Sequence, residues 1–353
     1  MYKILVINPG STSTRVGFFE DEREILRETI THDASFLSKF DKIFDQYEFR
    51  KSTVIDFLNK NHIDLKELSA VVGRGGIIHP VPAGTYSVNE KMIEDLRNAP
   101  IEHASNLGAV IAYEIAKPLG IPAFIVDPVV VDEFIPLARI SGLKEIERKS
   151  RLHALNMRRV AIQRAKEKGG SLSDFNFIVG HIGGGISIAP FMKGKIVDVN
   201  DASSGGPFSP ERTGSLPAGD LVKMCFSGKY TKKEIKKKLM GKGGVVAYLG
   251  TNDMREVERR IDEGDDFAKL IFEAMAYQIA KEIGADATVL KGDVDEIILT
   301  GGVVNSKRLV ELIKERVSFI APVVLFPGEK ELEALALGAL RVLRGEEEVK
   351  IYT

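Results

Sequence analysis

Apolar positions along the chain form short runs that alternate between the spacing of strands and the spacing of helices. The run at 4–7 is unbroken and mostly β-branched, as expected of a buried strand, and runs at 15–19 and 24–29 continue it as an antiparallel meander. The later elements of this half are helices at 44–58, 89–98 and 104–116 and short strands at 70–73 and 123–126. This alternation predicts an α/β fold.

The second half repeats the scheme, so that each half is read as β-β-β-α-β-α. Its elements are strands at 177–180, 186–190 and 296–300 and helices at 266–282 and 306–317. A last helix at 331–343 is expected to cross back to the first domain. We therefore predict two related domains, one of residues 1–148 with 335–353 and the other of residues 149–334.

Length and composition agree with this organisation. A chain of 353 residues suggests about two domains, and 44% hydrophobic residues are enough to give each a core. The net charge of −1 provides no general attraction for nucleic acid or an anionic membrane. The single cysteine, Cys225, excludes an internal disulfide and a cysteine-rich metal site. No run approaches the roughly 18 apolar residues of a membrane span, so we expect a cytoplasmic protein.

The first candidate for chemistry is the turn after the first strand, NPGSTSTR at 8–15. A glycine permits a tight turn here, and backbone N–H groups, hydroxyls and one guanidinium can converge on phosphate oxygens. These phosphate-binding candidates are Gly10, Ser11, Thr12, Ser13 and Arg15. The carbonyl oxygen of Asn8 can reach a hydrated Mg²⁺. An ordinary hairpin turn is the alternative.

A related strand, glycine turn and strand return about half a chain later, as GHIGGGIS at 180–187. Three consecutive glycines, Gly183, Gly184 and Gly185, remove every Cβ that would obstruct a triphosphate. His181 can donate to a phosphate, or it is a core histidine that bonds to the backbone. Neither turn opens a helix, so neither is a P-loop or a dinucleotide-binding motif. Two such hairpins suggest two related domains that face one nucleotide.

A third glycine turn, LTGGVVN at 299–305, follows a predicted strand and precedes a predicted helix. Gly301, Gly302 and Asn305 can accept a nucleoside base or ribose, or they form a plain strand-to-helix turn. The strong charge run at 230–242 has the spacing of an amphipathic basic helix. A solvated helix face explains this run better than a site for an anionic partner.

The three turns and their order match a known family. The chain resembles the acetate and butyrate kinases, most closely the butyrate kinase branch, within the superfamily of actin, hexokinase and heat-shock chaperone ATPases. The motifs NPGSTSTR, GRGG, PAGTYSVNE, HIGGGIS, PERTGSLPAGD and LTGGVVNS occur in the family order over essentially the whole chain. The resemblance implies an actin-like ATPase fold of two duplicated domains with a nucleotide cleft between them. It also implies reversible transfer of a phosphoryl group from ATP to a short-chain carboxylate, with Mg²⁺, giving ADP and an acyl phosphate.

The resemblance assigns two arginines and an aspartate to catalysis. Arg74, in GRGG, matches the arginine that pairs with the substrate carboxylate, and Arg212, in PERTG, matches the one expected to stabilise the transferring phosphoryl group. Cations are needed because a carboxylate must approach a polyanionic triphosphate. Asp127, at the end of an apolar strand, matches a site acid that holds an arginine or the metal-bound water. A structural salt bridge is the alternative.

Two histidines and a glutamate follow from the same resemblance. His153 matches a histidine that hydrogen-bonds to the transition state, and His103 matches a histidine of the substrate site. Glu333, at the start of the last helix, matches the glutamate that contacts Mg²⁺ through water. Glu331 is the alternative register, and either acid can also be present because the helix dipole favours it.

Asp253 and Arg255, in TNDMRE, match the family pair near the adenosine. The resemblance places Asp253 on the ribose and Arg255 on the base. Without it, the same residues indicate only a helix N-cap.

Three positions bear on the length of the acid. Gly75 and Gly76 stand where acetate kinases usually have two valines, and Leu152 stands where they have an aromatic residue. Both changes remove bulk, so we expect a wider apolar pocket that favours butyrate or isobutyrate, although each methylene gives only about 1–3 kcal/mol of discrimination.

Two other functions stay open. One is an acetate or propionate kinase of the same family, and the other is a nucleotide-dependent switch like actin, which needs no acceptor arginine. The resemblance further implies a homo-oligomer, a dimer or a multiple of it, that binds ATP and a carboxylate but neither nucleic acid nor membrane.

Overall fold

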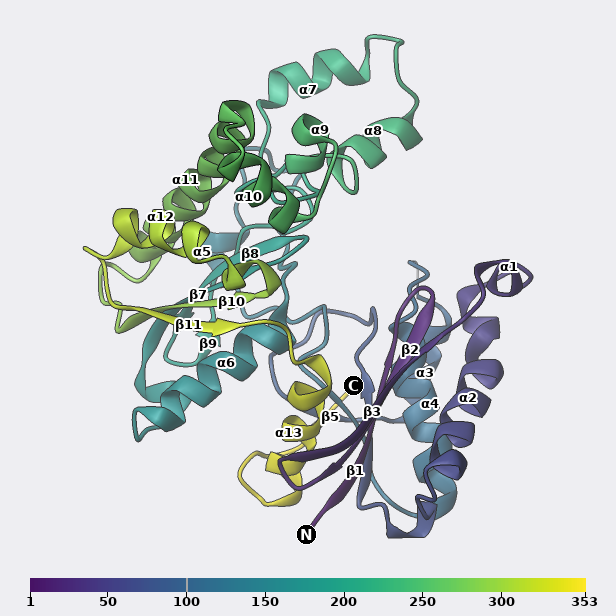
Figure 1. The fold of residues 1–353 in the computed structure, drawn as a ribbon. Helices are drawn as coiled ribbons and strands as arrows, with labels where there is room; N and C mark the ends of the chain where they lie inside the picture. The colour runs from purple at the N-terminus through teal and green to yellow at the C-terminus, as the bar shows by residue number, and fades with distance from the viewer. Residues whose placement is uncertain (100) are drawn as a thin grey trace. The chain divides into compact units, whose positions relative to one another are not determined.

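A computed structural model describes residues 1–99 and 101–353, which form two compact units (Figure 1). The first unit contains residues 1–131 and 330–353, and the second contains residues 132–329. The sequence-based prediction placed the two domain boundaries later along the chain, after residue 148 and after residue 334. The segment after 131 goes with the second unit because Arg148 pairs with Asp198 at 2.8 Å, and the last helix packs along its length on the first sheet.

The first unit is built on a mixed sheet of seven strands in the order β12-β5-β6-β4-β1-β2-β3. The strands are β1 (Lys3–Pro9), β2 (Ser13–Glu20), β3 (Arg23–Thr31), β4 (Ala70–Arg74), β5 (Thr85–Ser87), β6 (Ala123–Val126) and β12 (Lys350–Ile351). β1, β2 and β3 form an antiparallel meander, whereas β4 and β6 run parallel to β1. The strand ends after Pro9, Arg74 and Val126 therefore meet at one edge of the sheet.

Helices cover both faces of this sheet (Figure 1). They are α1 (Ala34–Leu37), α2 (Tyr47–Lys60), α3 (Glu90–Arg97), α4 (Asn106–Ala116) and α13 (Glu331–Leu343), with 3₁₀ turns η1 (Ile43–Gln46), η2 (Leu65–Glu67) and η3 (Lys117–Leu119). Leu5 and Ile7 of β1 join the core under α2, α3 and α4. Since side chains alternate along a strand, the neighbouring positions face α13, where Gly338 lies against Val126.

The second unit has a five-stranded sheet in the order β11-β10-β7-β8-β9. The strands are β7 (Asn176–Ile182), β8 (Ile186–Met192), β9 (Lys195–Ile196), β10 (Glu296–Gly301) and β11 (Val323–Pro327). β7, β8 and β9 are antiparallel, whereas β10 runs parallel to both β7 and β11. The arrangement repeats that of the first sheet, with a meander followed by parallel strands.

The helices of the second unit surround its sheet and extend beyond it (Figure 1). They are α5 (Pro136–Arg139), α6 (Ala154–Glu167), α7 (Ala218–Cys225), α8 (Lys232–Leu239), α9 (Val245–Leu249), α10 (Met254–Asp262), α11 (Asp266–Val289) and α12 (Lys307–Val317), with η4 (Leu172–Asp174) and η5 (Gly302–Asn305). The core joins β7, β8 and β10 to α11 and α12. α6 contacts β7 and β10 and lies outside that core.

The predicted α/β fold is confirmed, with the first meander, the first two strands of the second meander and the terminal helix where the hydrophobic pattern placed them. The predicted basic helix forms as α8, and most of its side chains are exposed. Sequence reasoning missed α6, the edge strands β9, β11 and β12, and the short strand β5 between β12 and β6. Among the described helices, none is long and apolar enough to cross a membrane.

Candidate active site

The turn between β1 and β2 forms a tight hairpin, as predicted. Asn8 faces Arg15 across the hairpin, and the Gly10 N–H donates to the Ser13 carbonyl at 2.8 Å. Ser11 and Thr12, at the tip, are exposed, and Thr14 is buried. The turn therefore presents backbone and hydroxyl groups to solvent at the edge of the sheet.

One carboxylate, that of Glu331, gathers residues from three strands of the first unit. Its Oε2 accepts from Asn8 Nδ2 at 2.8 Å and lies 3.4 Å from Arg15 Nη1. Its Oε1 lies 3.4 Å from Arg74 Nη1. Glu333, the register expected from the sequence, pairs with Lys330 at 3.0 Å. The structure thus brings the alternative register, Glu331, to Asn8, Arg15 and Arg74.

Arg74 and His103 are electrostatic neighbours. The Arg74 side chain is largely buried at the end of β4, and its Nη1 makes no hydrogen bond beyond the 3.4 Å ion pair. Burial and the charge of Arg74 lower the pKa of His103, so the imidazole is neutral at neutral pH. His103 Nδ1 is 2.7 Å from Ser105 Oγ. A guanidinium beside a neutral imidazole suits a planar carboxylate.

Asp127 follows β6 with a backbone φ of 39°, in the left-handed region that most residues avoid. It is buried, and its Oδ1 accepts from the Gly84 N–H at 2.7 Å. Its own N–H donates to the Gly84 carbonyl at 3.0 Å. Strained backbone of this kind persists where surrounding contacts hold it, and it is frequent at functional sites.

Gly75 and Gly76 do not open space for a longer acid. A Cβ on Gly75 would lie 2.5 Å from the Cβ of Pro128, and one on Gly76 would lie 2.6 Å from the Cα of Asn106. The expected widening at these glycines is therefore wrong, because neighbouring backbone already fills the space that a side chain would take. Leu152, in the second unit, is buried.

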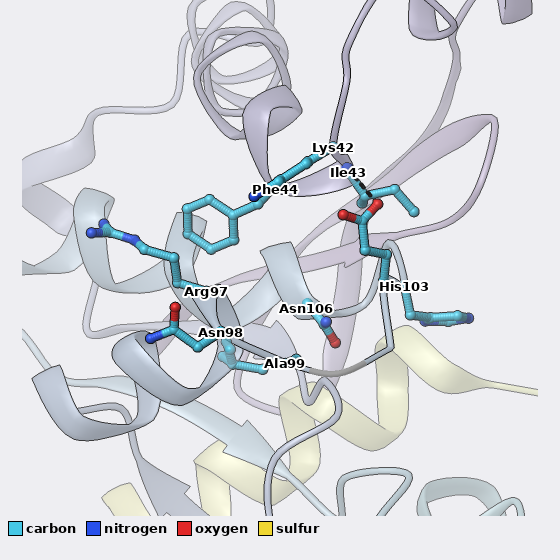
Figure 2. Close-up of a pocket in the computed structure, with 10 residues that line it drawn as sticks. Lys42, Ile43, Phe44, Arg97, Asn98, Ala99, His103 and Asn106 are labelled. Carbon is cyan, nitrogen blue, oxygen red and sulfur yellow. Dashed lines mark hydrogen bonds between the residues drawn. The ribbon is translucent and has the colours of Figure 1, made fainter.

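A cavity of about 270 Å³ lies beside His103 instead (Figure 2). It is lined by Lys42, Ile43, Phe44, Leu96, Arg97, Asn98, Ala99, Glu102, His103 and Asn106. Glu102 Oε2 accepts from the Ile43 N–H at 3.2 Å and ties the 42–44 segment to the wall. Arg97 stacks over the Phe44 ring at 5.3 Å and, in Figure 2, points away from His103.

In the second unit, the glycine turn between β7 and β8 lets three charged side chains approach closely. A Cβ on Gly185 would lie 2.5 Å from Arg212 Cζ, and one on Gly184 would lie 3.3 Å from Glu211 Oε1. A Cβ on Gly183 would lie 3.1 Å from Glu329 Oε1 and from His181 Nε2. A side chain at Gly185 would displace the Arg212 guanidinium, whereas at Gly183 and Gly184 the neighbouring groups would have to shift by only a few tenths of an ångström.

Arg212 reaches this turn with part of its guanidinium unsatisfied. Its Nη1 donates to the Ala202 carbonyl at 2.8 Å, but its buried Nε makes no hydrogen bond. Ser209 ties the loop to the turn, because its Oγ donates to the Gly184 carbonyl at 2.6 Å and accepts from the Arg212 N–H. Burial lowers the pKa of Arg212, although it remains a cation. A buried N–H without an acceptor suits an incoming oxyanion.

His153 and His181 stack on each other, with ring centroids 4.0 Å apart and planes inclined by 12°. His181 Nδ1 is 3.1 Å from Asn156 Nδ2, which can only donate, so His181 Nε2 carries the proton toward Glu329 Oε1 at 3.1 Å. His153 Nδ1 is 2.8 Å from Ser187 Oγ. The sequence-based reading missed Asn156 and Ser187, which orient the two rings.

Four of the five remaining predicted nucleotide residues, Asp253, Arg255, Gly302 and Asn305, line a cavity of about 820 Å³ within the second unit, and Gly301 does not. Its lining is Gly184, Pro210, Asn252, Asp253, Met254, Arg255, Glu258, Gly302, Val303, Asn305 and Ser306. Three segments distant in sequence, carrying Gly184, Asp253 and Gly302, thus share one cavity. Gly301 has a φ of 101° and touches the Ile182 backbone, so no side chain fits there. Asn305 Nδ2 donates to the Gly302 carbonyl at 2.8 Å.

Asp253 and Arg255 pair with each other at the edge of this cavity. Arg255 Nη2 lies 2.8 Å from Asp253 Oδ2, and these bonds lower the pKa of Asp253 to about 2. Asp253 is also the N-cap residue of α10, as predicted by the alternative in which this segment is only a helix N-cap. Glu258 and Ser306 were missed by sequence reasoning; they bond to each other at 2.8 Å from elements far apart in the chain.

Asn8 and Glu331 form a suitable donor set for Mg²⁺. Asn8 turns its amide nitrogen to Glu331, so its Oδ1 is the remaining oxygen donor beside a carboxylate. Within residues 1–99 and 101–353, no group of three or more His, Cys, Asp or Glu side chains could hold a metal by itself. Mg²⁺ is usually held by one or two protein oxygens together with substrate phosphates and water, so the residues fit the ion.

These features define a nucleotide-dependent phosphotransferase of the carboxylate kinase class. The chain belongs to the acetokinase family, whose model matches residues 144–323, just over half of the chain. Members of this family use ATP and ADP as co-substrates.

Solved structures share the fold over nearly the whole chain. Acetate kinase from Porphyromonas gingivalis is 20% identical with a TM-score of 0.82, covering 97% of this chain and 100% of its own. A propionate kinase from Francisella tularensis is 18% identical with a TM-score of 0.76, covering 96% and 99%. Acetate kinase from Entamoeba histolytica is 17% identical with a TM-score of 0.76, covering 98% and 99%. The predicted two-domain, actin-like architecture is thus confirmed.

Proposed function

We propose that this protein transfers the γ-phosphoryl group of ATP reversibly to a short-chain carboxylate, and that the preferred acid is butyrate or isobutyrate. One observation carries the proposal: each unit places, near a glycine turn, a partly buried arginine with one buried N–H group that lacks a hydrogen bond. Arg74 shares the Glu331 carboxylate with Asn8 and Arg15, and Arg212 lies against Gly185 with an unsatisfied Nε. A nucleotide switch has no need of an acceptor arginine.

In the proposed reaction, a carboxylate oxygen forms a bond to the γ-phosphorus while the bond to the bridging oxygen of ADP breaks. Arg74 and His103 orient the carboxylate for in-line attack, and Arg212 and His153 donate to the equatorial oxygens, where charge accumulates. Asp127 fixes the backbone that follows β6. Mg²⁺, bound near Asn8 and Glu331, would offset the charge of the phosphates.

ATP is assigned to both glycine turns and to the 820 Å³ cavity. Gly10, Ser11, Thr12, Ser13 and Arg15 are proposed to bind the terminal phosphates from the first unit, and Gly183, Gly184, Gly185 and His181 from the second. Asp253, Arg255, Gly301, Gly302 and Asn305 are proposed to bind the adenosine. Their support is the shared lining of one cavity by Gly184, Asp253, Arg255, Gly302 and Asn305.

The choice of butyrate rests on the resemblance to the butyrate kinase branch and on the cavity beside His103. Ile43, Phe44, Leu96 and Ala99 supply the apolar part of its wall, and the other lining residues are polar or charged, so only this part can contact the acyl chain. Because each methylene supplies about 1–3 kcal/mol at most, the preference is expected to be graded.

An acyl-hydroxamate assay over straight and branched acids from C2 to C5 tests this function. We expect kcat/KM to be highest with butyrate or isobutyrate. A maximum at acetate or propionate would support a carboxylate kinase but would contradict butyrate or isobutyrate as the preferred acid. ATP turnover that does not depend on any acid would contradict the kinase itself.

Two further properties are proposed on the strength of the family resemblance. The protein is a homo-oligomer, a dimer or a multiple of it, and it works in the cytoplasm, where a chain with one cysteine needs no oxidising compartment. Analytical ultracentrifugation of the purified protein tests the oligomer, since a monomer at micromolar concentration would contradict it.

A further inference from the structure

Arg50 is a completely buried arginine that the site described above does not include. It lies in the first turn of α2, and its exposed fraction is 0%. Its Nη1 donates to the Ser13 carbonyl at 2.9 Å and to Thr14 Oγ1 at 3.2 Å. Its Nη2 donates to the Ser11 carbonyl at 3.1 Å. Three of its hydrogen bonds therefore end on the phosphate turn of the first unit.

The charge of Arg50 has no anionic partner. Its other acceptor is Gln46 Oε1, at 3.0 and 3.1 Å, and among the described residues no carboxylate pairs with it. The first turn of a helix also disfavours a cation, because the helix dipole is positive there. Burying an unpaired charge is costly, and burial lowers the pKa of Arg50 accordingly. A neutral side chain would hold the same fold at lower electrostatic cost.

The contacts of Arg50 approach the turn from behind. The carbonyls of Ser11 and Ser13 point to Arg50, and the Thr12 carbonyl accepts from the His32 N–H at 2.8 Å. His32 Nε2 lies 2.8 Å from Thr14 Oγ1 and completes the support. The side chains of Ser11 and Thr12 are exposed. The backbone acceptors are thus fixed on the buried side, while the exposed side stays available to a ligand.

We propose that Arg50 is a positioning residue of the phosphate site, which orders the turn at 10–15 and supplies the positive charge that favours a polyphosphate ligand there. The inference rests on the proposed assignment of this turn to the terminal phosphates of ATP. A bound triphosphate provides the missing negative charge, and the intervening protein screens it less than water would. Arg50 acts through the turn and does not touch the reacting atoms.

The test compares nucleotides that differ in their phosphates, by calorimetric titration of the full-length protein. Arg50→Gln keeps a donor but loses the charge, and Arg50→Lys keeps the charge. Lys51→Met, at the next residue of α2, removes the same charge from a partly exposed position where Lys51 pairs with Glu48 and Glu114. Circular dichroism and Tm verify that each variant folds.

We expect Arg50→Gln to raise the Kd for ATP on the order of tenfold, with a smaller rise for ADP and a change below about twofold for adenosine. Arg50→Lys is expected to recover most of the ATP affinity, and Lys51→Met to match the wild type. Equal losses for ATP and adenosine, or Arg50→Lys as weak as Arg50→Gln, would overturn the inference.

Three further variants keep the result decisive. If Arg50→Gln does not fold, Thr14→Val keeps the side-chain volume and removes one bond to Arg50 together with the bond to His32. The loss should again fall on ATP and spare adenosine. An equal loss for both nucleotides, or no loss, would refute the role of Arg50. Ser13→Ala and Arg15→Ala test the turn itself. If neither changes ATP affinity, the proposed phosphate assignment fails, whereas a failure of Arg50 alone removes only this inference.

Discussion

Glu331 shows how a single side chain organises half of the proposed site. Its two oxygens contact Asn8, Arg15 and Arg74, which come from three strands of one sheet. Glu333 is two residues further along α13 and pairs with Lys330. Two residues along a helix correspond to about 200° of rotation, so the two acids belong to different faces.

Glu331 and Glu333 provide a matched test of which of the two glutamates lies at the proposed Mg²⁺ site. We expect Glu331→Gln to lower kcat by on the order of 10- to 100-fold and to raise the Mg²⁺ concentration needed for half-maximal rate. Glu333→Gln, the control on the same helix, should stay within about twofold of the wild type. Steady-state rates measured against Mg²⁺ decide between them, and the reverse pattern would restore Glu333 as the metal residue.

Arg212 is the residue whose loss should affect the chemical step most. Its buried Nε lacks an acceptor, and its guanidinium lies against Gly185. We expect Arg212→Ala to lower kcat by on the order of 10²–10³-fold, with a smaller effect on the KM for ATP. Single-turnover measurements separate the rate of phosphoryl transfer from the rates of substrate binding and product release. Near-normal kcat with a raised KM would make Arg212 a binding residue only.

At this scale the sequence predicted residues that sit in motifs and missed residues that act through tertiary contacts. Arg74 and Arg212 were found because short glycine-containing motifs surround them. Arg50, Asn156 and Ser187 stand in ordinary helix or strand sequence, and their roles come from partners 25 or more positions away. Motif reading has no access to such pairs.

Among the elements, α11 carries a buried acid that the packing leaves unsatisfied. Asp286 is 5% exposed, and its Oδ2 makes no hydrogen bond. Burial raises the pKa of Asp286 well above its ordinary value, and the neighbouring charges of Glu282 and Asp198 add to this, opposed by Arg148. The folded state therefore holds this proton up to a higher pH than the unfolded chain does.

This linkage predicts the sign of a stability change. A group with a raised folded pKa contributes stability below its unfolded pKa, about 3.9, and that contribution is lost as the pH rises through the folded pKa. Asp286→Asn should therefore raise the free energy of unfolding at pH 8 by about 1–2 kcal/mol and flatten its pH dependence. Urea unfolding from pH 5 to 8 checks this. Glu273→Gln, exposed on the same helix, should change it by less than about 0.5 kcal/mol.

The hydrophobic pattern predicted β1, β2, α4, α11 and α13 because their apolar spacing is regular. It missed α6, where polar Asn156 and Arg159 are buried among apolar residues and blur the helical period. It also missed β5 and β12, which are two or three residues long and are held by pairing with neighbouring strands. Their formation depends on the sheet and not on local preference.

On the scale of the whole molecule, the first unit is made from two separate pieces of chain and the second from one. The last 24 residues supply α13, whose Leu335, Ala336 and Ala339 are fully buried on the first sheet. The second unit, residues 132–329, contains its own sheet, its own core and the cavity proposed to bind adenosine.

Because only the first unit needs two pieces of chain, we expect the two units to differ in their ability to fold on their own. Residues 132–329 expressed alone should melt cooperatively and bind adenosine, whereas residues 1–329 should lose the structure of the first unit because one face of its sheet is uncovered. Circular dichroism melting and calorimetric titration test both fragments. A 1–329 protein that melts like the full chain would contradict the structural role assigned to α13.

The contact between Glu331 and Arg74 has a kinetic consequence. In the proposed reaction the acid must bind an arginine that an intramolecular carboxylate already occupies at 3.4 Å. Glu331 is therefore a built-in competitor of the substrate, with an effective concentration set by the fold. The Glu331→Gln variant lacks this competing carboxylate, so it should bind the acid more tightly even though its turnover is lower. The apparent KM for the acid and kcat should therefore decrease together.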